Sequence, residues 1–145
     1  MMKLFHKNVC LYLPGIVFAV VLVSGCGSSG QKVVGTVKLP DGSPLSKGGI
    51  MFDNGQTNVI GNLDAKGRFT LYQFKPGDGV PPGNYQGMIR YEVDIPFGLS
   101  PAARNAELAK LLPFSPKYLK METAGLTLTV EAGKNVAPLE IVLEK

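Results

Sequence analysis

Short segments of alternating apolar and polar residues, separated by turn sequences, recur along this chain after residue 31. The clearest is 125–131 (GLTLTVE), in which Leu126, Leu128 and Val130 share one side. A period of two is typical of a β-strand with one buried face, because successive side chains point to opposite faces. Six further segments are predicted to be strands, at residues 32–39, 49–53, 57–63, 68–74, 84–93 and 138–144.

The sequences between these segments favour chain reversal. Residues 40–44 (PDGSP) combine a proline, which fixes φ, with an Asp-Gly pair that tolerates left-handed geometry. Residues 54–55 (NG) and 132–135 (AGKN) are also predicted turns, and the glycine that ends 64–67 (DAKG) suits a left-handed position. Seven strands at this spacing predict an all-β fold, a β-sandwich.

Residues 94–122 interrupt this rhythm and are predicted to form an insertion. Within it, residues 101–112 (PAARNAELAKLL) predict a short helix, because Pro101 suits the first turn and Ser100 can cap it. An insertion of this length is often functional. The alternative is that it packs over a sheet end or shields an edge strand. The predicted partner-contact surface consists of the apolar residues Ile95, Phe97, Leu99, Phe114 and Tyr118.

Residues 1–25 are predicted to be a secretory signal peptide. A short basic start precedes the 15-residue apolar stretch 9–23 (VCLYLPGIVFAVVLV), which is the order found in such leaders. The alternative is a transmembrane helix, but the stretch is shorter than the roughly 20 residues that span a bilayer. Pro14 and Gly15 would also interrupt that helix.

Residues 23–26 (VSGC) resemble the bacterial lipobox, in which an aliphatic residue and two small residues precede an invariant cysteine. The resemblance implies that the lipoprotein signal peptidase recognises Val23, Ser24 and Gly25. It also implies that Cys26 carries a diacylglyceryl group and becomes the acylated, for example palmitoylated, first residue. Two or three acyl chains give a stable membrane anchor. The alternative is an ordinary signal peptide that is cut elsewhere.

The anchor sets the predicted domain organisation and location. Residues 26–32 are predicted to be a flexible tether, followed by one domain at 33–145. Gly27 stands where an aspartate is associated with inner-membrane retention in some bacteria, so the outer membrane is favoured. The domain is expected to face the periplasm or the cell surface.

Several turn and core phrases are similar to a known family. They are residues 34–37 (VGTV) with 41–45 (DGSPL), Gly61 with 64–69 (DAKGRF), 82–85 (PGNY), and 115–118 (SPKY) ahead of 125–127 (GLT). Over about residues 33–144 the chain resembles the carboxypeptidase-regulatory-like, transthyretin-like domain, most closely in small lipoproteins of planctomycete bacteria. The resemblance implies a seven-stranded Greek-key sandwich at the cell envelope, with no established activity.

The residue types exclude several chemistries from the predicted domain. His6 is the only histidine and lies in the leader, so the domain lacks the imidazole of Ser–His or Cys–His catalysis and of ordinary zinc sites. Asp53, Asp64 and Asp78 offer oxygen ligands for calcium, but aspartates in turns usually cap their own backbone. We therefore expect no metal, no cofactor beyond the lipid on Cys26, and no enzymatic activity.

Binding is the function class that remains. The chain has 15 basic and 11 acidic residues without a basic run, so no nucleic-acid partner is expected. It has no tryptophan, and sugar stacking would depend on Tyr72, Tyr85, Tyr91 or Tyr118. We expect a non-catalytic envelope lipoprotein that contacts another envelope protein or a polysaccharide. The alternatives are a self-associating structural protein and a carboxylate-based enzyme, and the oligomeric state stays open.

Overall fold

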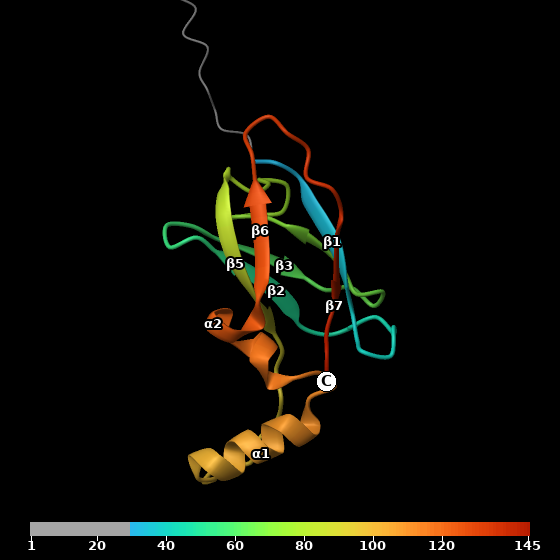
Figure 1. Cartoon of the computed structure of the whole chain (residues 1–145), viewed down its shortest axis with the longest axis vertical. Helices are drawn as coiled ribbons and strands as arrows, with labels where there is room; N and C mark the ends of the chain where they lie inside the picture. The colour runs from blue at the N-terminus through green and yellow to red at the C-terminus, as the bar shows by residue number, and fades with distance from the viewer. Residues whose placement is uncertain (1–29) are drawn as a thin grey trace, which may run out of the picture.

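The computed structural model describes residues 30–145, which form two β-sheets and a small helical segment (Figure 1). One sheet has the order β4-β1-β7, and the other has the order β3-β2-β5-β6. The bounds are β1 Val33–Lys38, β2 Gly49–Asp53, β3 Asn58–Asn62, β4 Arg68–Leu71, β5 Gly83–Arg90, β6 Leu126–Val130 and β7 Leu139–Val142. A mostly β chain with two sheets is thus confirmed, as expected of a β-sandwich.

The predictions for the leader concern residues that precede this fold. The predicted signal peptide 1–25, with Val23, Ser24 and Gly25, and the predicted lipidation residue Cys26 lie outside the described residues. At the end of the predicted tether, Gln31 exchanges backbone hydrogen bonds of 2.8 and 2.9 Å with Val80. The sandwich therefore holds the chain two residues before β1 begins.

The alternation in the sequence matches the burial of the strands. In β1, Val33, Gly35 and Val37 are buried and the residues between them are partly exposed. Neighbouring strands run antiparallel except for β1 and β7, which are parallel. Side chains of both sheets meet in one core, where Phe52 and Tyr85 are among the largest fully buried residues. The two inner faces thus bury the apolar phase of each strand, which is the main stabilising contribution to such a fold.

The strand predicted at 68–74 is shorter than its pattern indicated. β4 ends at Leu71, and Tyr72 then exchanges two backbone hydrogen bonds of 3.0 Å with Ile60 on β3. The chain thereby leaves one sheet and joins the edge of the other. Phe74, predicted within the strand, is 83% exposed in the loop that follows. The predicted strand at 84–93 likewise ends at Arg90, where the insertion departs.

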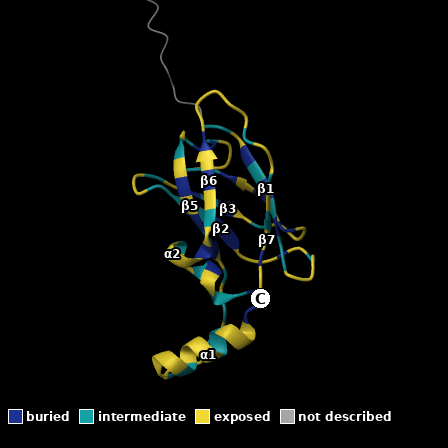
Figure 2. Ribbon diagram, in the orientation of Figure 1, coloured by how far each residue is buried: buried dark blue, intermediate teal, exposed yellow. Residues whose placement is uncertain are grey.

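The insertion divides into two parts with different surroundings. Helix α1 (Pro101–Leu111) has no buried residue, and it extends beyond the sheets as a largely exposed element (Figure 2). Its predicted cap is confirmed, because Ser100 Oγ accepts a hydrogen bond from Ala103 N at 3.3 Å. Residues 112–124, named here the closing segment, contain the 3₁₀ helix η1 (Pro116–Leu119) and α2 (Met121–Ala124). None of the helices within 30–145 is both long and apolar enough for a membrane span.

The closing segment is hydrogen-bonded to the residues that follow β7. Ser115 N donates to Glu144 O at 2.8 Å, and Glu144 N donates to the Tyr118 hydroxyl at 3.2 Å. Because β1 runs parallel to β7, the first residue of β1 lies at the opposite pole, about 20 Å away for six residues of strand. The chain therefore enters the domain at one pole and carries its insertion at the other (Figure 1).

Two ion pairs near the C-terminus predict a specific pH dependence. Hydrogen bonds from Lys117 and Lys38 lower the pKa of Glu144 and of Glu140, respectively. A carboxyl group whose folded pKa is lowered stabilises the fold above its unfolded pKa of about 4.3, and this contribution is lost as the pH falls through the folded pKa. We expect this contribution to the melting temperature to be lost as the pH falls from about 5 through the lowered pKa values of the two groups.

The test is a comparison with the double variant Glu140→Gln/Glu144→Gln. Its melting temperature should fall less steeply over the same pH range, and the difference should be small because both pairs are exposed. Identical pH profiles for the two proteins would contradict a role of these pairs in acid sensitivity.

Candidate functional site

The structure separates the five residues predicted to contact a partner. Phe114 and Tyr118 are only 1% and 5% exposed and belong to the core. The Phe114 ring lies edge-on to Tyr91, with 5.5 Å between centroids, and edge-on to Tyr118 at 6.3 Å. The assignment of Phe114 and Tyr118 to an exposed contact surface is therefore corrected. Both side chains are apolar because they close the end of the sandwich.

The remaining predicted contact residues lie on the exposed part of the insertion. Residues 94–111, named here the arm, comprise the loop that follows β5 and helix α1. Phe97 is 99% exposed, and Ile95 and Leu99 are partly buried beside it. Gly98, with φ of 87°, turns the chain directly after Phe97. Contact between these residues and a partner stays a prediction.

The three aspartates considered for calcium each bond to their own turn. Asp53 Oδ1 accepts a hydrogen bond from Gly55 N at 2.6 Å, and Asp64 Oδ1 accepts bonds from its own reversal. Asp78 Oδ2 accepts from Lys75 N at 3.0 Å and from Phe74 N at 3.3 Å. Backbone capping in these turns is therefore confirmed. Across residues 30–145 no three acidic, cysteine or histidine side chains gather in a way that could hold a metal ion.

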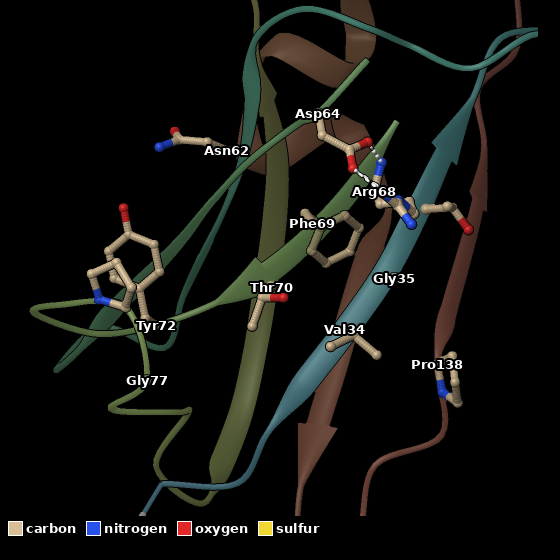
Figure 3. A pocket seen from close by; sticks show the side chains of 12 residues that line it. Val34, Gly35, Asn62, Asp64, Arg68, Phe69, Thr70, Tyr72, Gly77 and Pro138 are labelled. Atoms are coloured by element: carbon tan, nitrogen blue, oxygen red, sulfur yellow. Dashed lines mark hydrogen bonds and ion pairs between the residues drawn. The ribbon is translucent and has the colours of Figure 1, made fainter. Parts of the chain in front are cut away.

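A groove of about 620 Å³ lies on the outer face of β1 and β4 (Figure 3). The register places Thr36 opposite Arg68 and Val34 opposite Thr70, and all four side chains belong to the outward phase of their strands. Tyr72 continues the outward phase of β4, and Asn62 contributes from β3. The groove thus spans the place where the chain passes from one sheet to the other.

Gly61 allows the two sheets to approach each other closely at this junction. A side chain at Gly61 would place its Cβ 3.1 Å from Thr70 O and 3.2 Å from Leu71 Cδ2. Because Gly61 has no side chain, β3 approaches β4 and the two strands present one surface. The Ile60–Tyr72 hydrogen bonds, each 3.0 Å, then fix the backbone of the tyrosine at the edge of the groove.

The charged residues of the groove neutralise each other. Arg68 Nε and Nη2 both lie 2.8 Å from Asp64 Oδ2. The backbone N–H of Arg68, followed by its guanidinium and the N–H of Lys66, lowers the pKa of Asp64. Asp64 is therefore ionised at neutral pH, and no other charged residue among those described lines the groove.

Two groove residues, Tyr72 and Asp64, had a ligand role predicted from the sequence. Tyr72 was among the tyrosines considered for sugar stacking, and Asp64 was considered for calcium. Thr36, Thr70 and Asn62 were not singled out. The available signal was their outward phase on predicted strands, but the pattern does not say which outward residues become neighbours.

The chain was compared with protein-family models, with curated proteins and with solved structures. No protein-family model, no curated protein and no solved structure matches it. The likeness to transthyretin-like domains therefore stays a prediction.

Proposed function

We propose that this chain is a non-catalytic lipoprotein of the cell envelope, and that its domain is a binding module for another envelope component. In this proposal Cys26 bears the lipid and the domain is a Greek-key, transthyretin-like sandwich. The arm is the contact surface, and its partner is an envelope protein. Residues 30–145 form the binding module, and the predicted leader and lipobox direct the protein to the cell envelope.

The exposure of the arm is the observation that carries the proposal. Phe97 is 99% exposed, and α1 has no fully buried residue, although Leu108 packs partly buried against the core. The arm lies at the pole opposite the start of β1, so an anchor that precedes β1 would direct the arm away from the membrane. Aromatic side chains are enriched at protein–protein interfaces, where few residues carry most of the binding energy.

Four carboxyl groups are engaged in structural roles rather than set up as a general acid. A carboxylate-based enzyme needs a general acid whose pKa is raised toward the working pH. Hydrogen bonds from Ser43 lower the pKa of Asp41, and hydrogen bonds also lower the pKa of Asp64, Glu140 and Glu144. These four groups serve turns and ion pairs.

In-cell photo-cross-linking from the arm tests this function. A photoreactive amino acid replaces Phe97 in the full-length protein in its own host, and a second variant carries it at Thr129 on the exposed face of β6. We expect one dominant adduct with an envelope protein from position 97 and none from position 129. The adduct should disappear in the Cys26→Ala background, where the anchor is lost.

Two results would contradict the proposed function. Equal adducts from both positions would mean that the arm has no special role. An unchanged adduct in the Cys26→Ala background would mean that the lipid anchor does not place the protein beside its partner.

Self-association is the second candidate function, and the edges of the two sheets favour it. The β3 and β4 edges are joined by the Ile60–Tyr72 hydrogen bonds. At the opposite edges of the two sheets, a hollow of about 330 Å³ lies between β6 and β7. Its lining includes Leu126, Leu139 and Ile141. β6 (LTLTV) contains no proline or charged residue, the usual protections of an edge strand. A dominant adduct between two copies from position 129 would favour this candidate.

A further inference from the structure

The shape of the groove on β1 and β4 suits an extended ligand. Arg68, Thr70 and Tyr72 follow each other on the outward side of one chain segment, which spans about 13 Å over four residues of strand. The groove has a volume of about 620 Å³ and is an open depression rather than an enclosed cavity. That volume lies within the range of ligand-binding clefts, and a chain-like molecule can pass through without entering an enclosed cavity.

The chemistry of the lining suits an uncharged, hydroxyl-rich ligand. Thr36 and Thr70 each offer a hydroxyl, and Asn62 offers an amide with two donors and an acceptor. Arg68 is already paired with Asp64 through two contacts of 2.8 Å, so the groove has no free cation for a phosphate or carboxylate ligand. Tyr72 adds an aromatic ring with a polar tip, the combination that favours a partly apolar, partly wet ligand.

At its Tyr72 end, the groove is unsuited to the commonest way of binding an extended peptide. Peptides usually add a strand to a free sheet edge, because main-chain hydrogen bonds supply the affinity. At Tyr72 both backbone groups are bonded to Ile60 at 3.0 Å. The peptide would find no unpaired backbone there, whereas a saccharide is bound through side chains.

The local structure holds the lining in place before any ligand arrives. Asp78 Oδ2 accepts hydrogen bonds from Phe74 N and Lys75 N, which orders the loop that carries Pro76 and Gly77 beside the groove. Thr36 and Thr70 lie on paired strands. A preformed site loses less conformational entropy on binding.

We infer that this groove is a second binding site, for a segment of a linear, uncharged polysaccharide, with Tyr72 as the stacking residue. Thr36, Thr70 and Asn62 bind the hydroxyl groups of the saccharide. The site is separate from the arm, which lies at the pole of the insertion. Saccharide binding and the cross-link from position 97 can therefore fail independently.

Calorimetric titration of the full-length protein in detergent tests the inference. The probes are cellohexaose, laminarihexaose and chitohexaose as uncharged linear hexasaccharides, with hexagalacturonate as an anionic one. We expect at least one uncharged probe to bind and hexagalacturonate to bind more weakly. Tyr72→Ala should weaken binding about tenfold, the scale of one aromatic contact. Tyr72→Phe keeps the ring and should retain most of the affinity.

Further variants separate a groove effect from a folding effect. Thr70→Arg places a long cation in the groove at an exposed strand position and should abolish binding, while Phe97→Ala on the arm should leave it unchanged. Circular dichroism verifies that each variant is folded. The inference is overturned if none of the uncharged probes binds, if hexagalacturonate binds best, or if folded Tyr72→Ala and Thr70→Arg keep the original affinity.

Discussion

Phe114→Ala is expected to lower the free energy of unfolding by about 3–5 kcal/mol, the usual range for removing a buried phenylalanine. The side chain is 1% exposed, and its ring contacts those of Tyr91 and Tyr118. Its loss leaves a cavity at the junction of the closing segment and the sandwich. The measurement is urea unfolding followed by circular dichroism, because the chain has no tryptophan.

Phe97→Ala is the matched control for this prediction. The same atoms are removed from the same insertion, but Phe97 is 99% exposed. The expected change is within about 0.5 kcal/mol, as for most surface substitutions. Equal losses in the two variants, or a loss below about 1 kcal/mol for Phe114→Ala, would contradict the division of the insertion into arm and closing segment.

Gly67→Ala is expected to destabilise the fold by about 2–4 kcal/mol, for two reasons that add. Gly67 has φ of 69°, a conformation that disfavours any residue with a Cβ. The new Cβ would also lie 2.5 Å from Val37 O. The Val37 N–H donates to Gly67 O at 2.8 Å, so a movement that relieves the clash would also strain this bond.

Gly42→Ala isolates the conformational part of that effect. Gly42 has φ of 84°, but a Cβ there meets nothing within 4 Å. The expected loss is about 1–2 kcal/mol, that of a left-handed residue alone. The same urea unfolding experiment gives both values. If Gly42→Ala destabilises as much as Gly67→Ala, the close approach to Val37 contributes nothing.

The two proposed binding surfaces would give an anchored domain a division of roles. In this proposal the arm, at the pole away from the entry of the chain, is the surface for an envelope protein. The groove lies along the side of the sandwich, on β1 and β4, and is the inferred site for a polysaccharide strand. A lipoprotein with both surfaces would connect a membrane, a polysaccharide and a protein without catalysing a reaction.

Much of the fold was predictable because its signals are local. The alternation in 125–131 predicted β6 to within one residue at each end. Asp41 bonds to Ser43 N at 2.9 Å, as the predicted turn requires, and Ser100 caps α1. Each of these features depends on the conformational preferences of a few consecutive residues, which the sequence contains in full.

The candidate site was less predictable because its parts are distant in sequence. Phe97 and Phe114 are both aromatic residues in one insertion, and no local pattern separates the exposed ring from the buried one. Their difference comes from Tyr91 and Tyr118, which contact Phe114. The groove likewise depends on the register of β1 with β4 and on Tyr72 crossing to β3.

The sequence by itself determined the strand phases, the turns, the helix cap and the left-handed glycines, since steric and hydrogen-bonding preferences of adjacent residues decide them. Only the tertiary structure decided that Gly67 lies against Val37, that Phe114 closes the core, and that Thr36, Thr70 and Tyr72 share one groove. The physical reason is that a period of two tells which side of a strand is buried. It does not tell which strand becomes its neighbour, because that choice depends on packing across the whole core.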